Sequence, residues 1–128
     1  MLKILLLLAG GALGTLARYA LSGFVQMRTG SLFPWGTLSV NLMGCFLVGL
    51  LWGFFEESSW APHWRTFVFI GILGGFTTFS TYALESVNLL RDGEWRMAIL
   101  SMVLNNAGGI LLAYAGMVVA RYLVHVIR

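Results

Sequence analysis

Charged side chains are scarce in this chain of 128 residues, which has eight lysines and arginines and five acidic residues. They make up only 10% of the sequence, whereas apolar residues make up 59%, and the mean hydropathy is +0.84. Since a soluble domain has roughly 25% charged residues, this composition excludes that class. The basic residues are scattered, which also excludes a nucleic-acid partner. The composition predicts a membrane protein.

The sequence also lacks the residue combinations that enzymes need. Neither of its two histidines, His63 and His125, has a neighbouring metal ligand at a useful spacing. No pair of acidic residues falls inside an apolar run, and no base is placed to activate Ser80 or Ser101 as a nucleophile. The one cysteine, Cys45, has no disulfide partner. We therefore expect no enzymatic activity.

No acidic residue precedes Glu56. Small exporters that exchange protons for cationic drugs rely on a carboxylate within the first helix. The ionisable group within the first apolar run is Arg18, whose charge has the opposite sign. A small dual-topology, proton-coupled multidrug transporter is therefore an alternative function that this sequence disfavours.

Four long apolar runs are present instead. A helix needs about 20 residues to cross ~30 Å of hydrocarbon, and three of the runs reach that length. The first reaches it if it continues through Arg18 to Val25, with the arginine in contact with water or a polar partner. The sequence therefore predicts an all-α membrane protein, with residues 1–128 in a single transmembrane domain. The expected spans are residues 4–25, 35–55, 64–90 and 97–126. Because apolar character continues far along the first run, we expect a span there and not a cleaved signal peptide.

The third run contains an unusual stretch, GGFTTFSTYALE, at residues 74–85. Gly74 and Gly75 disfavour a helix, and the hydroxyl groups that follow compete for backbone hydrogen bonds. We therefore expect this helix to be broken in mid-membrane near residues 74–78. A break is tolerated there only where protein or a water-filled cavity surrounds it. Taken alone, the stretch fits a packed kink and an ion site equally well.

Other polar and aromatic side chains lie at membrane depth. Phe79 and Tyr82, three residues apart, share one face if the helix resumes after the break. Ser101 and Asn105, four apart, line one stripe of the fourth span. Deep asparagines, which need hydrogen-bond partners in hydrocarbon, are Asn41, Asn105 and Asn106. Hydrogen bonding between helices explains each one singly, but together with the break they favour a polar path for an anion.

Basic residues are evenly divided between the two membrane sides that four spans define. On one side are Lys3, Arg65, Arg121 and Arg128, and on the other Arg18, Arg28, Arg91 and Arg96. The positive-inside rule then gives almost no orientation preference. Coincidence among few residues explains this balance, and so does a chain that inserts both ways and pairs with an inverted copy of itself.

Three segments point to one family. They are GALGTLARY in the first run, PWGTLSVNLMG in the second and GGFTTFSTYALE in the third. In these motifs, their order and the chain length, the sequence resembles the Fluc family of small bacterial fluoride channels, also called CrcB proteins. The resemblance covers essentially the whole chain. It implies a fluoride-selective channel of the bacterial inner membrane that exports fluoride passively from the cytoplasm.

The resemblance further implies an assembly and a cation. Family members are antiparallel homodimers of dual topology, with two anion pores and a sodium ion at the dimer centre. By motif position, the backbone carbonyls of Gly74 and Thr77 bind that sodium. The implied partners are fluoride, the lipid bilayer and a second copy of the chain.

An anion pathway is also implied. Its residues, by matching position, are Asn41, Phe79, Ser80, Thr81, Tyr82, Ser101 and Asn105. Arg18 and Glu85 match recurring charged residues that support the path, either paired with each other or apart. Tyr82 replaces the usual second phenylalanine, so its hydroxyl is an added donor. Gly109 and Ala113 stand where relatives continue a polar stripe, which suggests one subunit of a heterodimeric fluoride channel as a further alternative.

Overall fold

The computed structural model describes residues 1–56 and 61–127, which are helical apart from short connections and contain no strand. The η segments have the wider turns of a π-helix. In chain order the helical segments are α1 (Leu2–Thr29), α2 (Trp35–Glu56), α3 (Pro62–Arg65), η1 (Thr66–Leu73), α4 (Gly74–Phe76), α5 (Phe79–Arg91), α6 (Trp95–Val103), η2 (Leu104–Gly108) and α7 (Gly109–Ile127).

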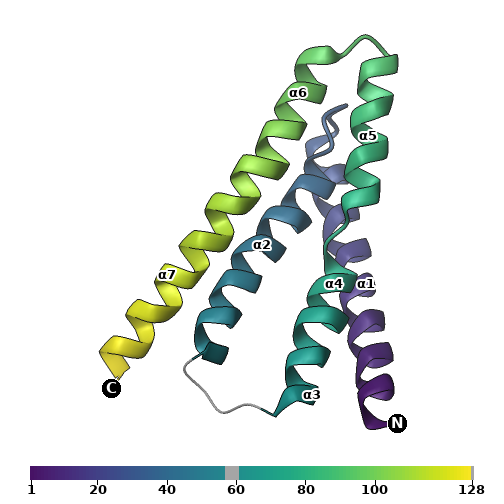
Figure 1. The fold of residues 1–128 in the computed structure, drawn as a ribbon. Helices are drawn as coiled ribbons and strands as arrows, with labels where there is room; N and C mark the ends of the chain where they lie inside the picture. The colour runs from purple at the N-terminus through teal and green to yellow at the C-terminus, as the bar shows by residue number, and fades with distance from the viewer. Residues whose placement is uncertain (57–60, 128) are drawn as a thin grey trace.

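Four spans in this chain are long and apolar enough to cross a membrane. They are α1, α2, the run from α3 to α5, and the run from α6 to α7. The prediction of an all-α protein with four transmembrane helices is therefore confirmed, and each span extends past its expected range at one or both ends. Both termini lie at one end of the molecule and the turn between α5 and α6 lies at the other (Figure 1).

The connection between α1 and α2 is held by the side chain of Gln26. Gly30 ends α1 with φ 55° and ψ 19°, a left-handed conformation that glycine adopts without steric cost. Gln26 Nε2 donates to the Ser31 carbonyl at 2.7 Å, and its Oε1 accepts from the Gly36 N–H at 3.1 Å. One side chain thus links the end of α1 to the first turn of α2.

Glycines allow the spans to approach closely. The main contacts are those of α1 with η1 and of α2 with α7. A Cβ atom on Gly10 would lie 3.0 Å from the Gly71 Cα and 2.8 Å from the Phe67 carbonyl oxygen. A Cβ atom on Gly49 would overlap the Ala113 carbonyl. Small residues of this kind let membrane helices associate by van der Waals packing.

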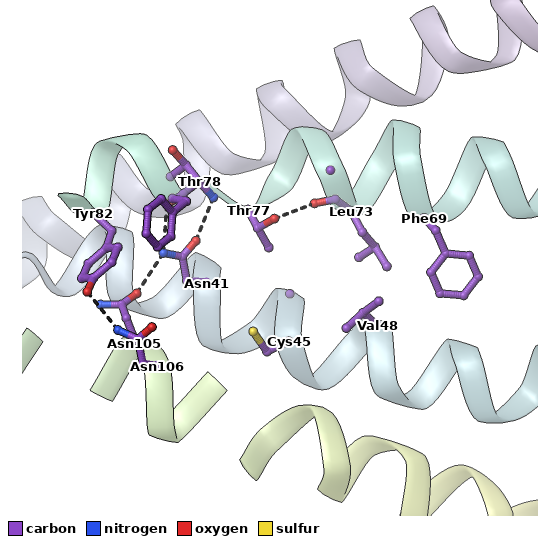
Figure 2. A pocket seen from close by; sticks show the side chains of 13 residues that line it. Asn41, Cys45, Val48, Phe69, Leu73, Thr77, Thr78, Tyr82, Asn105 and Asn106 are labelled. Atoms are coloured by element: carbon purple, nitrogen blue, oxygen red, sulfur yellow. Dashed lines mark hydrogen bonds between the residues drawn. The ribbon is translucent and has the colours of Figure 1, made fainter. Parts of the chain in front are cut away.

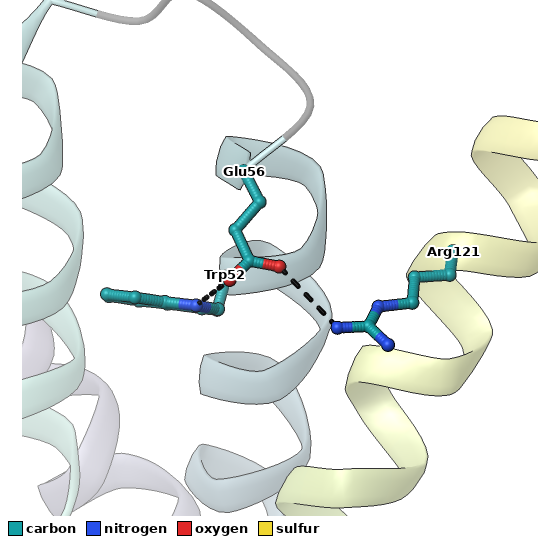
Figure 3. Close-up of polar contacts among 3 residues, drawn as sticks. All are labelled: Trp52, Glu56 and Arg121. Atoms are coloured by element: carbon teal, nitrogen blue, oxygen red, sulfur yellow. Dashed lines mark hydrogen bonds and ion pairs between the residues drawn. The ribbon is translucent and has the colours of Figure 1, made fainter.

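A polar and aromatic cluster joins three spans near the end of α2. Glu56 accepts a hydrogen bond from Trp52 Nε1 at 2.8 Å, and its other oxygen lies 3.8 Å from Arg121 of α7 (Figure 3). Arg65 of the third span lies over the Trp52 ring, 5.2 Å from its centroid. Because the side chains of Arg121 and Glu56 are 65% and 42% exposed, their ion pair contributes at most about 1 kcal/mol.

The third span is interrupted at Thr77 and Thr78, between α4 and α5. Both residues are extended, with φ −87° and ψ 157° at Thr77 and φ −148° and ψ 112° at Thr78. They lie in the range in which a break was expected, residues 74–78, whereas Gly74 and Gly75 in that range are helical. A Cβ atom on Gly75 would lie 2.8 Å from the Gly11 carbonyl oxygen. Gly75 therefore serves the packing on α1, and the two threonines carry the change in backbone direction.

Candidate functional site

Asn41 of α2 replaces hydrogen bonds that the helix loses at the interruption. Its Oδ1 accepts from the Thr78 N–H at 2.8 Å, and its Nδ2 donates to the Thr78 carbonyl at 3.1 Å (Figure 2). The same Nδ2 donates to Asn105 Oδ1 of η2 at 2.9 Å. Buried backbone groups without partners are unfavourable, so this one side chain stabilises the extended conformation of Thr78.

Thr78 in turn caps α5. Its Oγ1 accepts from the Thr81 N–H at 3.3 Å and donates to Thr81 Oγ1 at 2.9 Å. Threonine is a favourable N-cap residue because its oxygen satisfies a free N–H of the first turn. Our candidate residues did not include Thr78, although a threonine just before a helical segment is a recognisable sequence signal of such a cap.

Two aromatic rings follow the cap. Phe79 and Tyr82 have centroids 5.3 Å apart and ring planes at 70°, which confirms the shared face that their spacing predicted. Phe79 is 74% exposed, whereas Tyr82 is 8% exposed. The phenol oxygen of Tyr82 accepts a hydrogen bond from Asn106 Nδ2 at 2.9 Å (Figure 2). Ring edges carry partial positive charge, so this face is suited to an anion.

A cavity of about 320 Å³ lies between α2, the third span and η2. Its apolar end has the side chains of Val48, Leu73 and Phe69, and its polar end has those of Tyr82 and Asn105 (Figure 2). Candidate residues that line it are Asn41, Gly74, Thr77, Phe79, Tyr82 and Asn105. Six of the predicted residues, from two spans and η2, therefore meet at one place.

Ser101 is not among the residues that line this cavity. It is 1% exposed and sits one turn before Asn105 in the fourth span. Asn105 Nδ2 donates to the Ser101 carbonyl at 3.0 Å and to its Oγ at 3.4 Å. The stripe that the four-residue spacing predicted is therefore formed, and Ser101 acts within it as the support of Asn105.

Ser80 and Thr81 lie apart from this cavity. Both are exposed, and Thr81 lines a second cavity of about 250 Å³ together with Arg18, Thr37 and Thr78. Thr78 borders both cavities. The structure thus places the candidate residues on two sides of the interruption.

Arg18 and Glu85, which we considered as a possible pair, contact different partners. Arg18 Nη1 donates to the Thr77 carbonyl at 3.3 Å. Glu85 Oε1 accepts from Thr37 Oγ1 at 2.8 Å. The Glu85 Oε2 atom is buried, with no hydrogen-bond partner among residues 1–56 and 61–127. Arg18 therefore supports the interruption directly, and sequence reasoning did not identify Thr37 as the partner of Glu85.

The fourth span loses its polar stripe where it packs tightly on α2. A Cβ atom on Gly109 would lie 3.1 Å from Cys45 Sγ. The Ala113 carbonyl lies so close to Gly49 that a Cβ atom there would overlap it. Cys45 therefore fills space as a small side chain in this contact. A side chain at Gly109 would require the Cys45 side chain to shift.

The carbonyls of Gly74 and Thr77 are oxygen donors of the kind that hard cations such as sodium prefer. In an unbroken helix the Thr78 N–H would donate to the Gly74 carbonyl, but here it donates to Asn41, so the carbonyl is released. The Thr77 carbonyl accepts from Arg18 and keeps a second lone pair. Hard cations prefer several oxygen ligands, and two carbonyls from one chain are too few. These residues fit sodium if a second copy adds its own pair.

Comparison with known proteins matches the chain over nearly its whole length. The family profile described as "CrcB-like protein, Camphor Resistance (CrcB)" matches residues 5–117. A protein of Desulforapulum autotrophicum is 49% identical over 121 residues, covering 93% of this chain and 96% of its own. One from Parabacteroides distasonis is 38% identical over 128 residues, covering 100% of both chains. One from Magnetococcus marinus is 48% identical over 113 residues, covering 88% and 92%. Each of these relatives is named "Fluoride-specific ion channel FluC".

Proposed function

The chain belongs to the CrcB-like protein family, and from this premise we propose that two antiparallel copies form a passive channel through which fluoride leaves the cytoplasm. It is a fluoride channel, and it is a multi-pass protein of the bacterial membrane. The observation that carries this conclusion is the family match over residues 5–117, together with relatives that the chain covers almost completely. We place the channel in the inner membrane, across which fluoride leaves the cytoplasm.

We place the anion path along the polar end of the larger cavity. Fluoride is small and tightly hydrated, so a path must replace its water at several modest sites and not at one deep site. The rings of Phe79 and Tyr82 line this region together with Asn41 and Asn105. Thr81 lines the second cavity, which acts as an approach to the path, and the exposed Ser80 lies next to it in the chain.

An antiparallel dimer is supported by features of the single chain. Phe79 lines the cavity and yet is 74% exposed, so the cavity opens at the surface of the chain and a second copy would close it. The even division of basic residues allows insertion in both directions. A dimer would also bring four carbonyls together from Gly74 and Thr77 of each copy. We propose that these carbonyls hold a sodium ion that fixes the two interrupted spans.

The function is tested by reconstituting the purified chain into liposomes loaded with fluoride or, separately, with chloride. We expect rapid fluoride efflux without a proton gradient and much slower chloride efflux. Equal efflux of the two anions, or no fluoride efflux, would reject the channel. Proton-driven transport of a cationic drug in place of fluoride efflux would favour the multidrug transporter, and fluoride efflux only with a second, different chain would favour the heterodimer.

The path is tested by Phe79→Ile. Loss of the ring edge should lower fluoride efflux about 2- to 13-fold, the effect of roughly 0.5–1.5 kcal/mol for an aromatic contact. Size-exclusion chromatography should show an unchanged dimer. The matched control is Phe24→Ile, because Phe24 is a 53% exposed ring of α1 that lines neither cavity. Unchanged efflux in Phe79→Ile would remove this ring from the path.

A further inference from the structure

Tyr82 is held at both ends in the larger cavity. Its ring contacts Phe79, and its oxygen accepts a hydrogen bond from Asn106 Nδ2 at 2.9 Å. Asn106 Nδ2 also donates to the Met102 carbonyl at 2.8 Å, which fixes the amide group on η2. The amide nitrogen carries two hydrogens, and both are donated. Tyr82 is therefore the acceptor in its contact with Asn106.

This arrangement leaves the phenol proton of Tyr82 without an acceptor among the described residues. A phenol carries one proton in addition to its acceptor lone pairs. Since Asn106 supplies a hydrogen to the oxygen, the proton must point elsewhere. Tyr82 is 8% exposed and lines the cavity, so the space available for a proton acceptor lies within that cavity.

The other hydroxyl and amide donors that line the cavity are already used within the chain. Asn41 donates to Thr78 and Asn105, and Asn105 donates to Ser101. The hydroxyl groups of two threonines are also used: Thr77 Oγ1 donates to the Leu73 carbonyl at 3.0 Å, and Thr78 Oγ1 donates to Thr81 Oγ1 at 2.9 Å. Among the described lining residues, the Tyr82 hydroxyl is the side-chain O–H or amide donor that makes no hydrogen bond to an acceptor within the chain.

We propose that Asn106 positions the Tyr82 hydroxyl so that its O–H donates a hydrogen bond to the anion in the cavity. Tyr82 is then a specificity-determining residue, and Asn106 is its positioning residue. Fluoride accepts an O–H hydrogen bond more strongly than the larger chloride, because its charge is concentrated on a smaller ion. The inference rests on the proposed fluoride channel and assigns to Tyr82 a role that a phenylalanine ring edge cannot fill.

The experiment measures fluoride efflux from liposomes over a range of fluoride concentrations for Tyr82→Phe, Asn106→Leu and the double variant. Tyr82→Phe should lower efflux at low fluoride about 10-fold and raise the half-saturating concentration, as expected for one lost hydrogen bond to an anion. Asn106→Leu should lower efflux about 3-fold in the parent chain and have no effect in the Tyr82→Phe background. The control is Tyr114→Phe, since Tyr114 is 68% exposed on α7 and lies outside the cavity.

Efflux that is unchanged in Tyr82→Phe would overturn the proposal. So would an Asn106→Leu effect of equal size in both backgrounds, because a purely structural role of Asn106 does not depend on the phenol. If Asn106→Leu does not assemble, Asn106→Ser replaces it, since the shorter side chain does not reach the phenol. A parent chain without fluoride efflux rejects the channel itself, whereas an active parent with insensitive variants rejects only the role of Tyr82 and Asn106.

Discussion

In this protein, single side chains hydrogen-bond the backbone groups that have lost their helical partners at the interruption. The amide of Asn41 acts as both donor and acceptor for Thr78, and the guanidinium of Arg18 reaches the next carbonyl, that of Thr77. In hydrocarbon there is no water to take over these roles if a side chain is removed. The extended conformation of the two threonines therefore depends on residues of other helices more than on the threonines themselves.

Asn41→Leu should accordingly lower the free energy of unfolding by about 1–3 kcal/mol, because it leaves the Thr78 N–H without its partner and removes one donor from the Thr78 carbonyl. Denaturant titration in detergent micelles measures this change, and fluoride efflux should fall in parallel. Asn88→Leu is the control, since Asn88 is an exposed asparagine of α5. A similar loss of stability in both variants would show that any polar-to-apolar change destabilises the chain and that Asn41 has no special role.

At the scale of helices, the contact of α1 with η1 places the interrupted span. Gly10 and Gly71 face each other there, and Gly75 continues the contact one turn later against Gly11. The backbones approach so closely that no side chain separates them. This contact holds η1 and α4 against α1 up to the residue before the interruption.

Gly10→Ala should therefore destabilise the protein by roughly 1–3 kcal/mol, the usual effect of overpacking a tight contact. The matched control is Gly23→Ala in the same helix, because a Cβ atom there meets nothing within 4 Å. Alanine is the better helix former by about 1 kcal/mol, so this control should be neutral or stabilising. Thermal unfolding in detergent separates the two variants, and equal effects would contradict the close contact.

The helices were predictable from sequence and their mutual contacts were not. Apolar length alone determines a span, so the four runs predicted the four helices. Spacing within one helix predicted the pairs Phe79–Tyr82 and Ser101–Asn105. The break was expected near residues 74–78, and the extended residues in that range are Thr77 and Thr78, but the sequence did not show that Gly75 would stay helical and pack on α1. The partner of Tyr82, Asn106, was missed because it lies on another span. The sequence does not specify which side of that span faces Tyr82.

For the whole molecule, the equal distribution of basic residues has a direct consequence for insertion. The turn at Gly93 lies at the opposite end from both termini, so charges added at these two places favour opposite orientations (Figure 1). An antiparallel channel needs both orientations in one membrane. A chain that is biased either way alone should then lose activity.

A reporter at the C-terminus should be found on both sides of the membrane in similar amounts. Three lysines inserted after Gly93 should shift the reporter to one side and abolish fluoride efflux from that chain alone. Three lysines appended to the C-terminus should shift it to the other side, and co-expression of the two variants should restore efflux. A single orientation of the unmodified chain would contradict the antiparallel assembly.

The hydrogen bonds of Asn41 also imply an order of events during biogenesis. The ribosome delivers the chain from its N-terminus, so α2 reaches the bilayer before the third span and η2 arrives last. Asn41 is therefore in the membrane before Thr78 arrives. The two hydrogen bonds between them can form before the fourth span has been inserted. Asn105 then takes up the remaining donor of Asn41. The interruption is therefore completed by the last span to be synthesised.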